Sequence, residues 1–150
     1  MTTIPPIVKI LHNIDDTEQF SEELANYVNR LISFDDVEGV AAEPNTLTKE
    51  IYFMFFLGAL LATKYEFEIN TKQEPGKPDI LLKTPWYHAI FEIMVVDSET
   101  DEMMQNGAEE TIKQIDEKGY WKELGHLPLP IYKIGIACHG KKCLVKTVLH

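Results

Sequence analysis

With 150 residues and a mass of 17.2 kDa, the chain has the size of a single domain built around one hydrophobic core. A hydrophobic content of 45% excludes a disordered chain, and a formal net charge of −10 argues against a nucleic-acid coat protein, which would need a basic face. The longest apolar stretch, residues 51–62, is too short to span a bilayer, and residues 1–10 lack the pattern of a signal peptide, so we expect a cytoplasmic protein with no membrane partner.

The first third of the chain is predicted to be mainly helical. Residues 1–14 are expected to be irregular, because Pro5 and Pro6 disfavour an early helix. Apolar residues recur at helical spacing over residues 17–33, directly after side chains that can cap a helix. A second helix is predicted over residues 47–63. It is apolar on most faces, which indicates that it packs against a sheet.

Three predicted strands follow the second helix. Strict alternation of polar and apolar residues over 65–70 predicts a strand with one face in water. Residues 79–83 form the next predicted strand. A turn at residues 84–87 leads to a long apolar strand over 88–96, which we expect to be central in the sheet.

The last predicted elements are a helix over residues 104–123 and a hairpin formed by residues 131–138 and 141–146. The resulting order is α-α-β-β-β-α-β-β, without internal repeats. This order predicts an α/β fold with a mixed central β-sheet flanked by helices.

The two cysteines, Cys138 and Cys143, flank the turn of this hairpin. With Gly140 and Lys141 as the turn residues, the cysteines would face each other across the ladder. Because we expect a cytosolic location, we predict that both cysteines are reduced, half-buried thiols. The spacing has no second cysteine pair, which argues against zinc.

Acidic residues in two neighbouring strands point to a metal site. Asp79 follows Pro78 at the start of one predicted strand, and Glu92 lies in the middle of the next strand, which is otherwise apolar. An unpaired buried carboxylate is costly, so a buried acid needs a partner. Adjacent pairing would bring the two acids together, and two carboxylates with a backbone carbonyl and waters suit Mg²⁺ or Mn²⁺. Met94 points to the same face as Glu92, where metal-dependent hydrolysis would use a lysine.

These acids belong to an ordered series of short motifs. The series is a helix acid at Glu50, GKPDI at 76–80, IFEI at 90–93, QIDEKGY at 114–120 and KIGIA at 133–137. It resembles the PD-(D/E)XK nuclease superfamily over residues 50–146, and most closely the module at the C-terminus of many bacterial AAA-ATPase-like proteins. The resemblance implies one restriction-endonuclease-like domain, with a core over residues 47–150 and an N-terminal helical extension over residues 1–46.

The resemblance also implies roles for individual residues. Asp79 and Glu92 match the metal ligands of the family, which hold Mg²⁺ or Mn²⁺. Glu50 matches an upstream helix acid that completes the site. Gln114 and Tyr120 match a helix that supports the site or touches the DNA backbone.

Met94 departs from the family pattern at the lysine position. The departure predicts that DNA hydrolysis is impaired while metal binding is retained, so that the chain would act as a module that binds nucleic acid or a protein partner. Oligomeric state is left open by the sequence.

Two alternatives compete with this interpretation. The first is an active Mg²⁺-dependent nuclease in which another lysine replaces the missing one. Lys118 is a better candidate than Lys83, because the helix of Lys118 should cross the sheet near the acids. The second is an unrelated α/β interaction domain, in which the acids are surface groups or structural ion pairs.

Each candidate residue also has a plainer interpretation. Glu92 would be a structural acid paired with either of these lysines. Asp79 would cap a turn, and Glu50 would be a first-turn acid favoured by the helix dipole. Gln114 would be an ordinary polar helix residue, and Met94 would fill space in the core.

Overall fold

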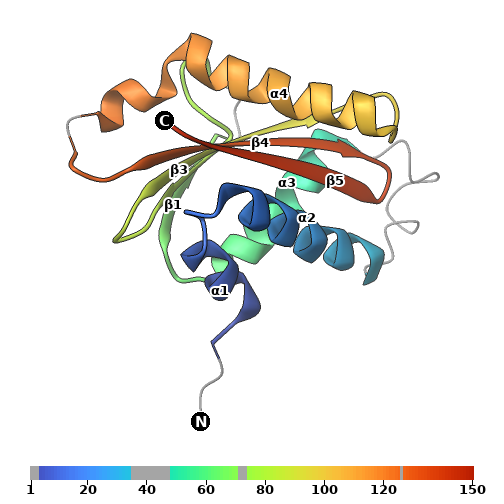
Figure 1. Ribbon diagram of the computed structural model, residues 1–150, viewed down its shortest axis with the longest axis horizontal. Coiled ribbons are helices and arrows are strands. Elements are labelled where there is room, and N and C mark those ends of the chain that lie inside the picture. Colours follow the sequence, from blue (N-terminus) through green and yellow to red (C-terminus); the bar gives the residue numbers. More distant parts are fainter. Residues whose placement is uncertain (1–3, 35–47, 71–73, 126) are drawn as a thin grey trace.

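A computed structural model describes residues 4–34, 48–70, 74–125 and 127–150. In this part of the chain, strands form one five-stranded sheet in the order β1-β2-β3-β4-β5 (Figure 1). The strands are β1 (Glu66–Ile69), β2 (Ile80–Lys83), β3 (His88–Val95), β4 (Ile131–His139) and β5 (Lys142–Leu149). Neighbouring strands are antiparallel except β3 and β4, which are parallel. The mixed sheet and its flanking helices confirm the predicted fold class.

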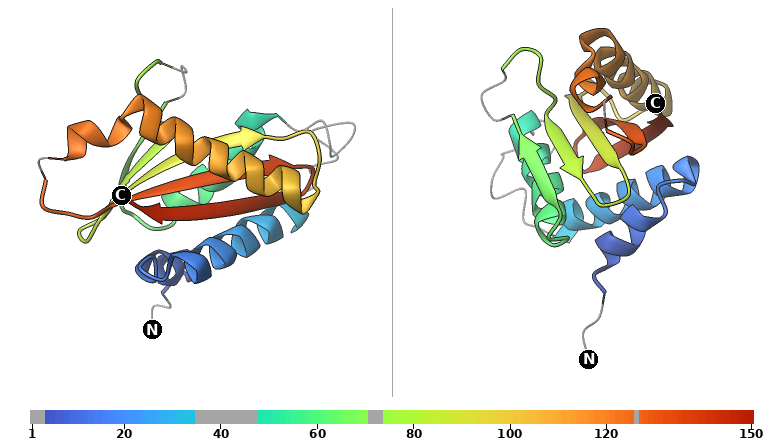
Figure 2. Two further views of the ribbon diagram at one scale, coloured as in Figure 1. Left: turned by 45° about the horizontal axis from the view of Figure 1, so that its top comes forward. Right: turned by 90° about the vertical axis from the view of Figure 1, so that its left-hand side faces the viewer.

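Helices cover both faces of the sheet. They are α1 (Pro6–His12), α2 (Thr17–Phe34), α3 (Lys49–Leu61), α4 (Asp101–Lys118) and the 3₁₀ helix η3 (Tyr120–Leu124). Figure 2 shows α4 on one face of the sheet and α1, α2 and α3 on the other. Within the described residues, no helix has the length and apolar character needed to cross a bilayer.

The prediction that residues 1–14 are irregular is wrong for the segment that forms α1. Pro6 stands at the first helical position, where its missing N–H would have no partner in any case and its fixed φ suits the helix. The helix is retained because it packs against the core. Its buried side chains are Ile7, Ile10 and Leu11.

The helix predicted over residues 104–123 is divided in two. It begins earlier, at Asp101, because the Thr100 side chain accepts a hydrogen bond from the Met103 amide at 3.4 Å and caps the first turn. It ends at Lys118, because Gly119 takes a left-handed conformation with φ of +63°. The rest of the predicted helix forms η3 instead.

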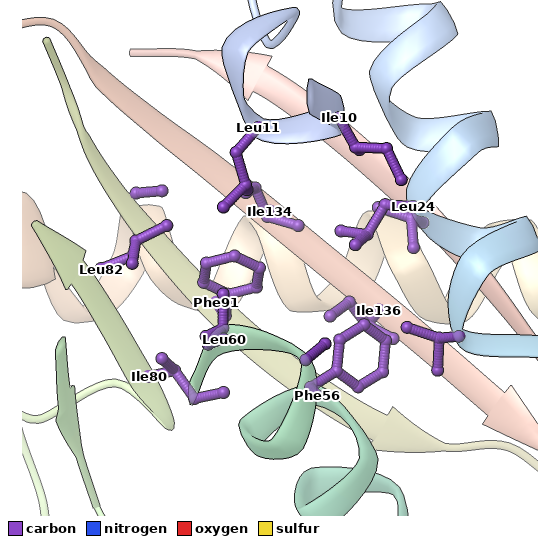
Figure 3. Packing of buried hydrophobic residues seen from close by; sticks show 14 of the residues in the cluster. Ile10, Leu11, Leu24, Phe56, Leu60, Ile80, Leu82, Phe91, Ile134 and Ile136 are labelled. Atoms are coloured by element: carbon purple, nitrogen blue, oxygen red, sulfur yellow. The ribbon is translucent and has the colours of Figure 1, made fainter. Parts of the chain in front are cut away.

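The main hydrophobic core lies between the sheet and the three N-terminal helices (Figure 3). Side chains alternate along β3, so Phe91 and Ile93 point into this core. Ile90 and Met94 point to the opposite face, where α4 and η3 pack on the sheet. Glu92 lies between Ile90 and Met94 in this alternation, and it therefore faces the α4 side.

A glycine on β4 allows α4 to lie very close to the sheet. A Cβ atom at Gly135 would lie 2.5 Å from the carbonyl oxygen of Ala108 and 3.0 Å from a side-chain carbon of Ile112, both on α4. Gly135 is also the register partner of Glu92 on β3. The close packing therefore holds the middle of α4 over β4, next to the strand that carries Glu92.

The two cysteines face each other as predicted. Cys138 pairs with Cys143 across β4 and β5, and their Sγ atoms lie 2.7 Å apart. Both are free thiols and both are fully buried, where half-buried thiols were expected. Burial raises the pKa of the Cys138 thiol well above its ordinary value, which keeps it protonated.

Candidate functional site

Asp79 and Glu92 meet at the beginning of β2. Ile80, the first residue of β2, pairs with Phe91 on β3, so Asp79 lies level with Glu92. Asp79 is 3% exposed and Glu92 is 6% exposed. The amide N–H of Ile93 donates a hydrogen bond to Asp79 Oδ2 at 2.9 Å, which holds this carboxylate against β3. The structure therefore brings together the two acids that the sequence singles out.

The two carboxyl groups share a site from which water is largely excluded. Burial raises the pKa of Glu92 from its ordinary 4.5 to about 7, and the charge of Asp79 and a hydrogen bond between the two carboxyl groups add to this rise. The positive charges of Lys49 and Lys118 oppose it. The pair of carboxyl groups therefore gains or loses a proton near neutral pH. A further cation beside the pair would favour the form in which both carboxyl groups are ionised.

Lys49, the first residue of α3, provides an ammonium group at this pair. Its Nζ atom lies 3.0 Å from Asp79 Oδ2, and its side chain is 30% exposed. Thr48 has an extended backbone at the N-cap, so the helix begins with Lys49 itself. This contact could not be predicted from the sequence, because α3 is apolar on most faces and the pattern does not show which side of its first turn meets the sheet. The one available signal was the adjacency of Lys49 to Glu50.

The end of α4 lies beside the same two acids. The left-handed Gly119 redirects the chain after α4, and the buried Tyr120 then lies against Glu92. Burial raises the pKa of the Tyr120 hydroxyl, and the charge of Glu92 and a hydrogen bond to it add to the rise. The exposed Lys118 places its Nζ 5.9 Å from the centre of the Tyr120 ring. Tyr120 and Lys118 thus border Glu92.

The family of the chain follows from residues that include this cluster. A family model described as the PD-(D/E)XK nuclease superfamily matches residues 48–148. The chain belongs to the PD-(D/E)XK nuclease superfamily. No curated protein sequence matches it. The predicted superfamily is confirmed, and the closer resemblance to the ATPase-associated module stays a prediction.

The PD-(D/E)XK pattern also suggested Glu50 and Gln114. Glu50 is exposed on the first turn of α3, and Gln114 is half-buried on α4. Among the residues that the structure describes, no three Asp, Glu, His or Cys side chains form a group that could hold a metal ion. Glu50 therefore does not complete a set of three acids with Asp79 and Glu92.

The two candidate lysines from the sequence differ in position. Lys118 lies near Glu92, where its charge lowers the pKa of that carboxyl group. Lys83, at the other end of β2, pairs with Glu68 on β1 at 2.6 Å. Lys83 is therefore engaged away from the acids, and Lys49 and Lys118 are the cations beside them.

Met94 stands where the PD-(D/E)XK pattern has its lysine. Its side chain packs in a small apolar cluster under α4, together with Val96 and Met104. A Cβ atom at Gly107 on α4 would lie 3.8 Å from Met94 Sδ, so the helix passes directly over the thioether. Met94 thus fills space between β3 and α4 and contributes no charge to the site.

The residues present fit a divalent metal ion with hard oxygen ligands. PD-(D/E)XK nucleases usually use such ions. Two buried carboxylates in contact repel each other, as the raised pKa of Glu92 shows, and a divalent cation between them would remove that repulsion. Asp79 and Glu92 would supply the side-chain ligands, and backbone carbonyls and waters would complete the set that Mg²⁺ or Mn²⁺ requires.

Proposed function

We propose that this domain is a nuclease that depends on Mg²⁺ or Mn²⁺ and hydrolyses phosphodiester bonds of nucleic acid. The observation that carries the proposal is the ammonium group of Lys49, 3.0 Å from Asp79 Oδ2. Met94 by itself favours impaired hydrolysis, because the family lysine is missing from β3. Lys49 supplies the missing positive charge from α3, and Lys118 adds a second one at the rim.

Several contacts preorganise the two acids for a metal ion. The Ile93 amide holds Asp79, and the buried Tyr120 lies beside Glu92. Such supporting hydrogen bonds orient metal ligands and are needed for tight binding. When bound, the divalent ion would lower the pKa of a ligand water and balance charge on the scissile phosphate.

Lys49 is suited to the role of a transition-state stabiliser. An ammonium group carries three N–H donors on a flexible stem, so it can contact both Asp79 and a phosphate oxygen or an attacking water. Its side chain is 30% exposed, whereas that of Asp79 is 5% exposed, so Lys49 connects the buried acids with the surface. Loss of one such stabilising group typically costs roughly 3 kcal/mol, or about a hundredfold in rate.

The surroundings of the site favour a nucleic-acid backbone as the substrate. Lys49 and Lys118 are the cations beside the acids, and phosphate oxygens are natural partners for both. The body of the protein, with a net charge of −10, repels nucleic acid. Binding should therefore be weak without the metal ion and should decrease as salt is added.

A second candidate function is a binding module that does not hydrolyse its ligand. The apolar packing of Met94 under α4 supports it, since this strand position carries no charge to the reaction. In that case the ion pair of Lys49 with Asp79 would neutralise the acids permanently, in place of a metal ion.

A cleavage assay separates the two candidates. Supercoiled plasmid, single-stranded DNA and RNA would each be incubated with the wild-type protein in Mg²⁺, in Mn²⁺ and in EDTA. We expect metal-dependent cleavage of at least one substrate, abolished in Asp79→Asn and lowered about a hundredfold in Lys49→Ala. Lys113→Ala is the matched control, because Lys113 is a solvent-exposed lysine of α4 and should leave the rate unchanged.

Three results would count against the nuclease proposal. Cleavage that persists in Asp79→Asn would come from a contaminant or from another site. A cleavage rate in Lys49→Ala equal to that of the wild type would show that Lys49 takes no part in the reaction. Binding of nucleic acid by a wild-type protein that cleaves none of the three substrates would support the binding module instead.

A further inference from the structure

A second site lies at the other end of β2 from Asp79. A cavity of about 190 Å³ opens between the end of α1, the turn that joins β2 to β3, and the start of β4. Its lining includes the aromatic side chains of Trp86, Tyr87 and Tyr132, together with His12 and Asp15. Ligand pockets for drug-sized molecules are larger, typically about 300 Å³ or more, so this cavity suits a small group or the end of a side chain.

The aromatic walls of the cavity are held in place by specific contacts. The rings of Tyr87 and Tyr132 meet edge to face, with centroids 5.4 Å apart and an interplanar angle of 82°. The Tyr87 hydroxyl donates a hydrogen bond to the Leu11 carbonyl oxygen at 2.8 Å. In the turn, the amides of Trp86 and Tyr87 both donate to the side-chain oxygen of Thr84. The cavity is therefore preformed.

Trp86 presents an unusually large aromatic surface to solvent. Its side chain is 53% exposed, although tryptophan is normally well buried. Its ring centroid lies 4.7 Å from that of His12 and 6.1 Å from that of Tyr65. The indole thus remains available to a ligand at the mouth of the cavity.

The charge around the cavity favours a cation. Asp15 supplies a carboxylate close to Tyr132; burial raises the pKa of the tyrosine hydroxyl, and the charge of Asp15 adds to the rise. No lysine or arginine is among the described residues that line the cavity, so an anion would find no permanent counter-charge. The faces of tryptophan and tyrosine rings carry negative partial charge and attract cations, most strongly where water is excluded.

We propose that this cavity binds a methylated ammonium group, such as that of choline or of a trimethyllysine side chain, against Trp86, Tyr87 and Tyr132, with Asp15 balancing its charge. The trimethylated ammonium of choline or trimethyllysine is quaternary and has no N–H that needs an acceptor, so aromatic walls bury it without leaving a donor unpaired. A primary ammonium carries three N–H donors, and on entering the cavity these donors would lose their hydrogen bonds to water.

The test is a titration of the full chain followed by NMR of the tryptophan indole N–H signals. The ligands are choline, a peptide with trimethyllysine, the same peptide with unmodified lysine, and 3,3-dimethylbutan-1-ol, the neutral analogue of choline. We expect a saturable shift of the Trp86 signal with a methylated ligand and binding of the neutral analogue at least about tenfold weaker. Trp121, whose indole nitrogen is buried and which stacks on His150, is the internal control and should not shift.

Two variants examine the residues named in the proposal. Trp86→Ala removes a largely exposed side chain, and it should weaken binding at least about tenfold without unfolding the protein. Asp15→Asn keeps the shape of an exposed side chain and should weaken binding of the cation but not of the neutral analogue. Binding of choline alone would identify a free amine as the ligand, and binding of the methylated peptide would identify a modified protein. Equal binding of the neutral analogue, or no saturable shift with either methylated ligand, would overturn the proposal.

Discussion

Replacing Glu92 with glutamine should stabilise the protein at pH 8 and leave it unchanged at low pH. The pKa of Glu92 rises in the folded protein from its ordinary 4.5 to about 7. Between these values the folded protein keeps a proton that the unfolded chain has lost, so the free energy of unfolding decreases as the pH rises through this window. A pKa shift of this size corresponds to a loss on the order of 3 kcal/mol in the free energy of unfolding of the wild type above pH 7, where Glu92 is ionised. Glutamine carries no charge and avoids this cost.

Urea unfolding at pH 5 and pH 8, in EDTA, measures the effect. The wild type should lose on the order of 3 kcal/mol more than Glu92→Gln between the two pH values. Glu110→Gln is the control, because Glu110 is an exposed acid of α4 and its replacement should follow the wild type. Parallel pH profiles for the wild type and Glu92→Gln would refute the reasoning, since they would show that burial beside Asp79 does not disfavour the ionised form.

Two further predictions concern the packing of α4 and the lysine position. Gly135→Ala should destabilise the protein by about 1–3 kcal/mol or more in urea unfolding, because its Cβ would collide with α4. Gly58 has open space around it, so Gly58→Ala is the control and should not destabilise the protein. Equal effects of the two substitutions would contradict the packing account. Met94→Lys should change the cleavage rate by less than about tenfold, because Lys49 already supplies the ammonium group, whereas a large gain in rate would favour the binding module.

Much of the fold could be predicted from the sequence, because periodicity records which face of each element is buried. The alternation along residues 88–96 correctly placed Glu92 and Met94 on the same face of the sheet, the one that α4 and η3 cover. The residues at which helices begin and end were harder to predict. Pro6 was read as a helix breaker although it suits a first helical position, and the helix predicted to reach residue 123 ends at Lys118 because Gly119 follows it.

The acidic pair of the site could also be predicted, whereas its cation could not. Asp79 and Glu92 lie on adjacent antiparallel strands, so pairing alone brings them level. Lys49 reaches them from α3, an element distant in sequence from both strands, and its direction depends on how α3 docks. Because α3 is apolar on most faces, its sequence does not specify that docking, and the acid next to Lys49, Glu50, was named instead.

The most direct test of the metal-dependent site is Mn²⁺ binding followed by electron paramagnetic resonance at pH 8. The account predicts saturable binding to the wild-type protein, weakened at least about tenfold in Asp79→Asn and unchanged in Glu110→Gln, because the buried pair is the side-chain ligand set. Equal binding by the wild type and Asp79→Asn, or none by the wild type, would contradict it.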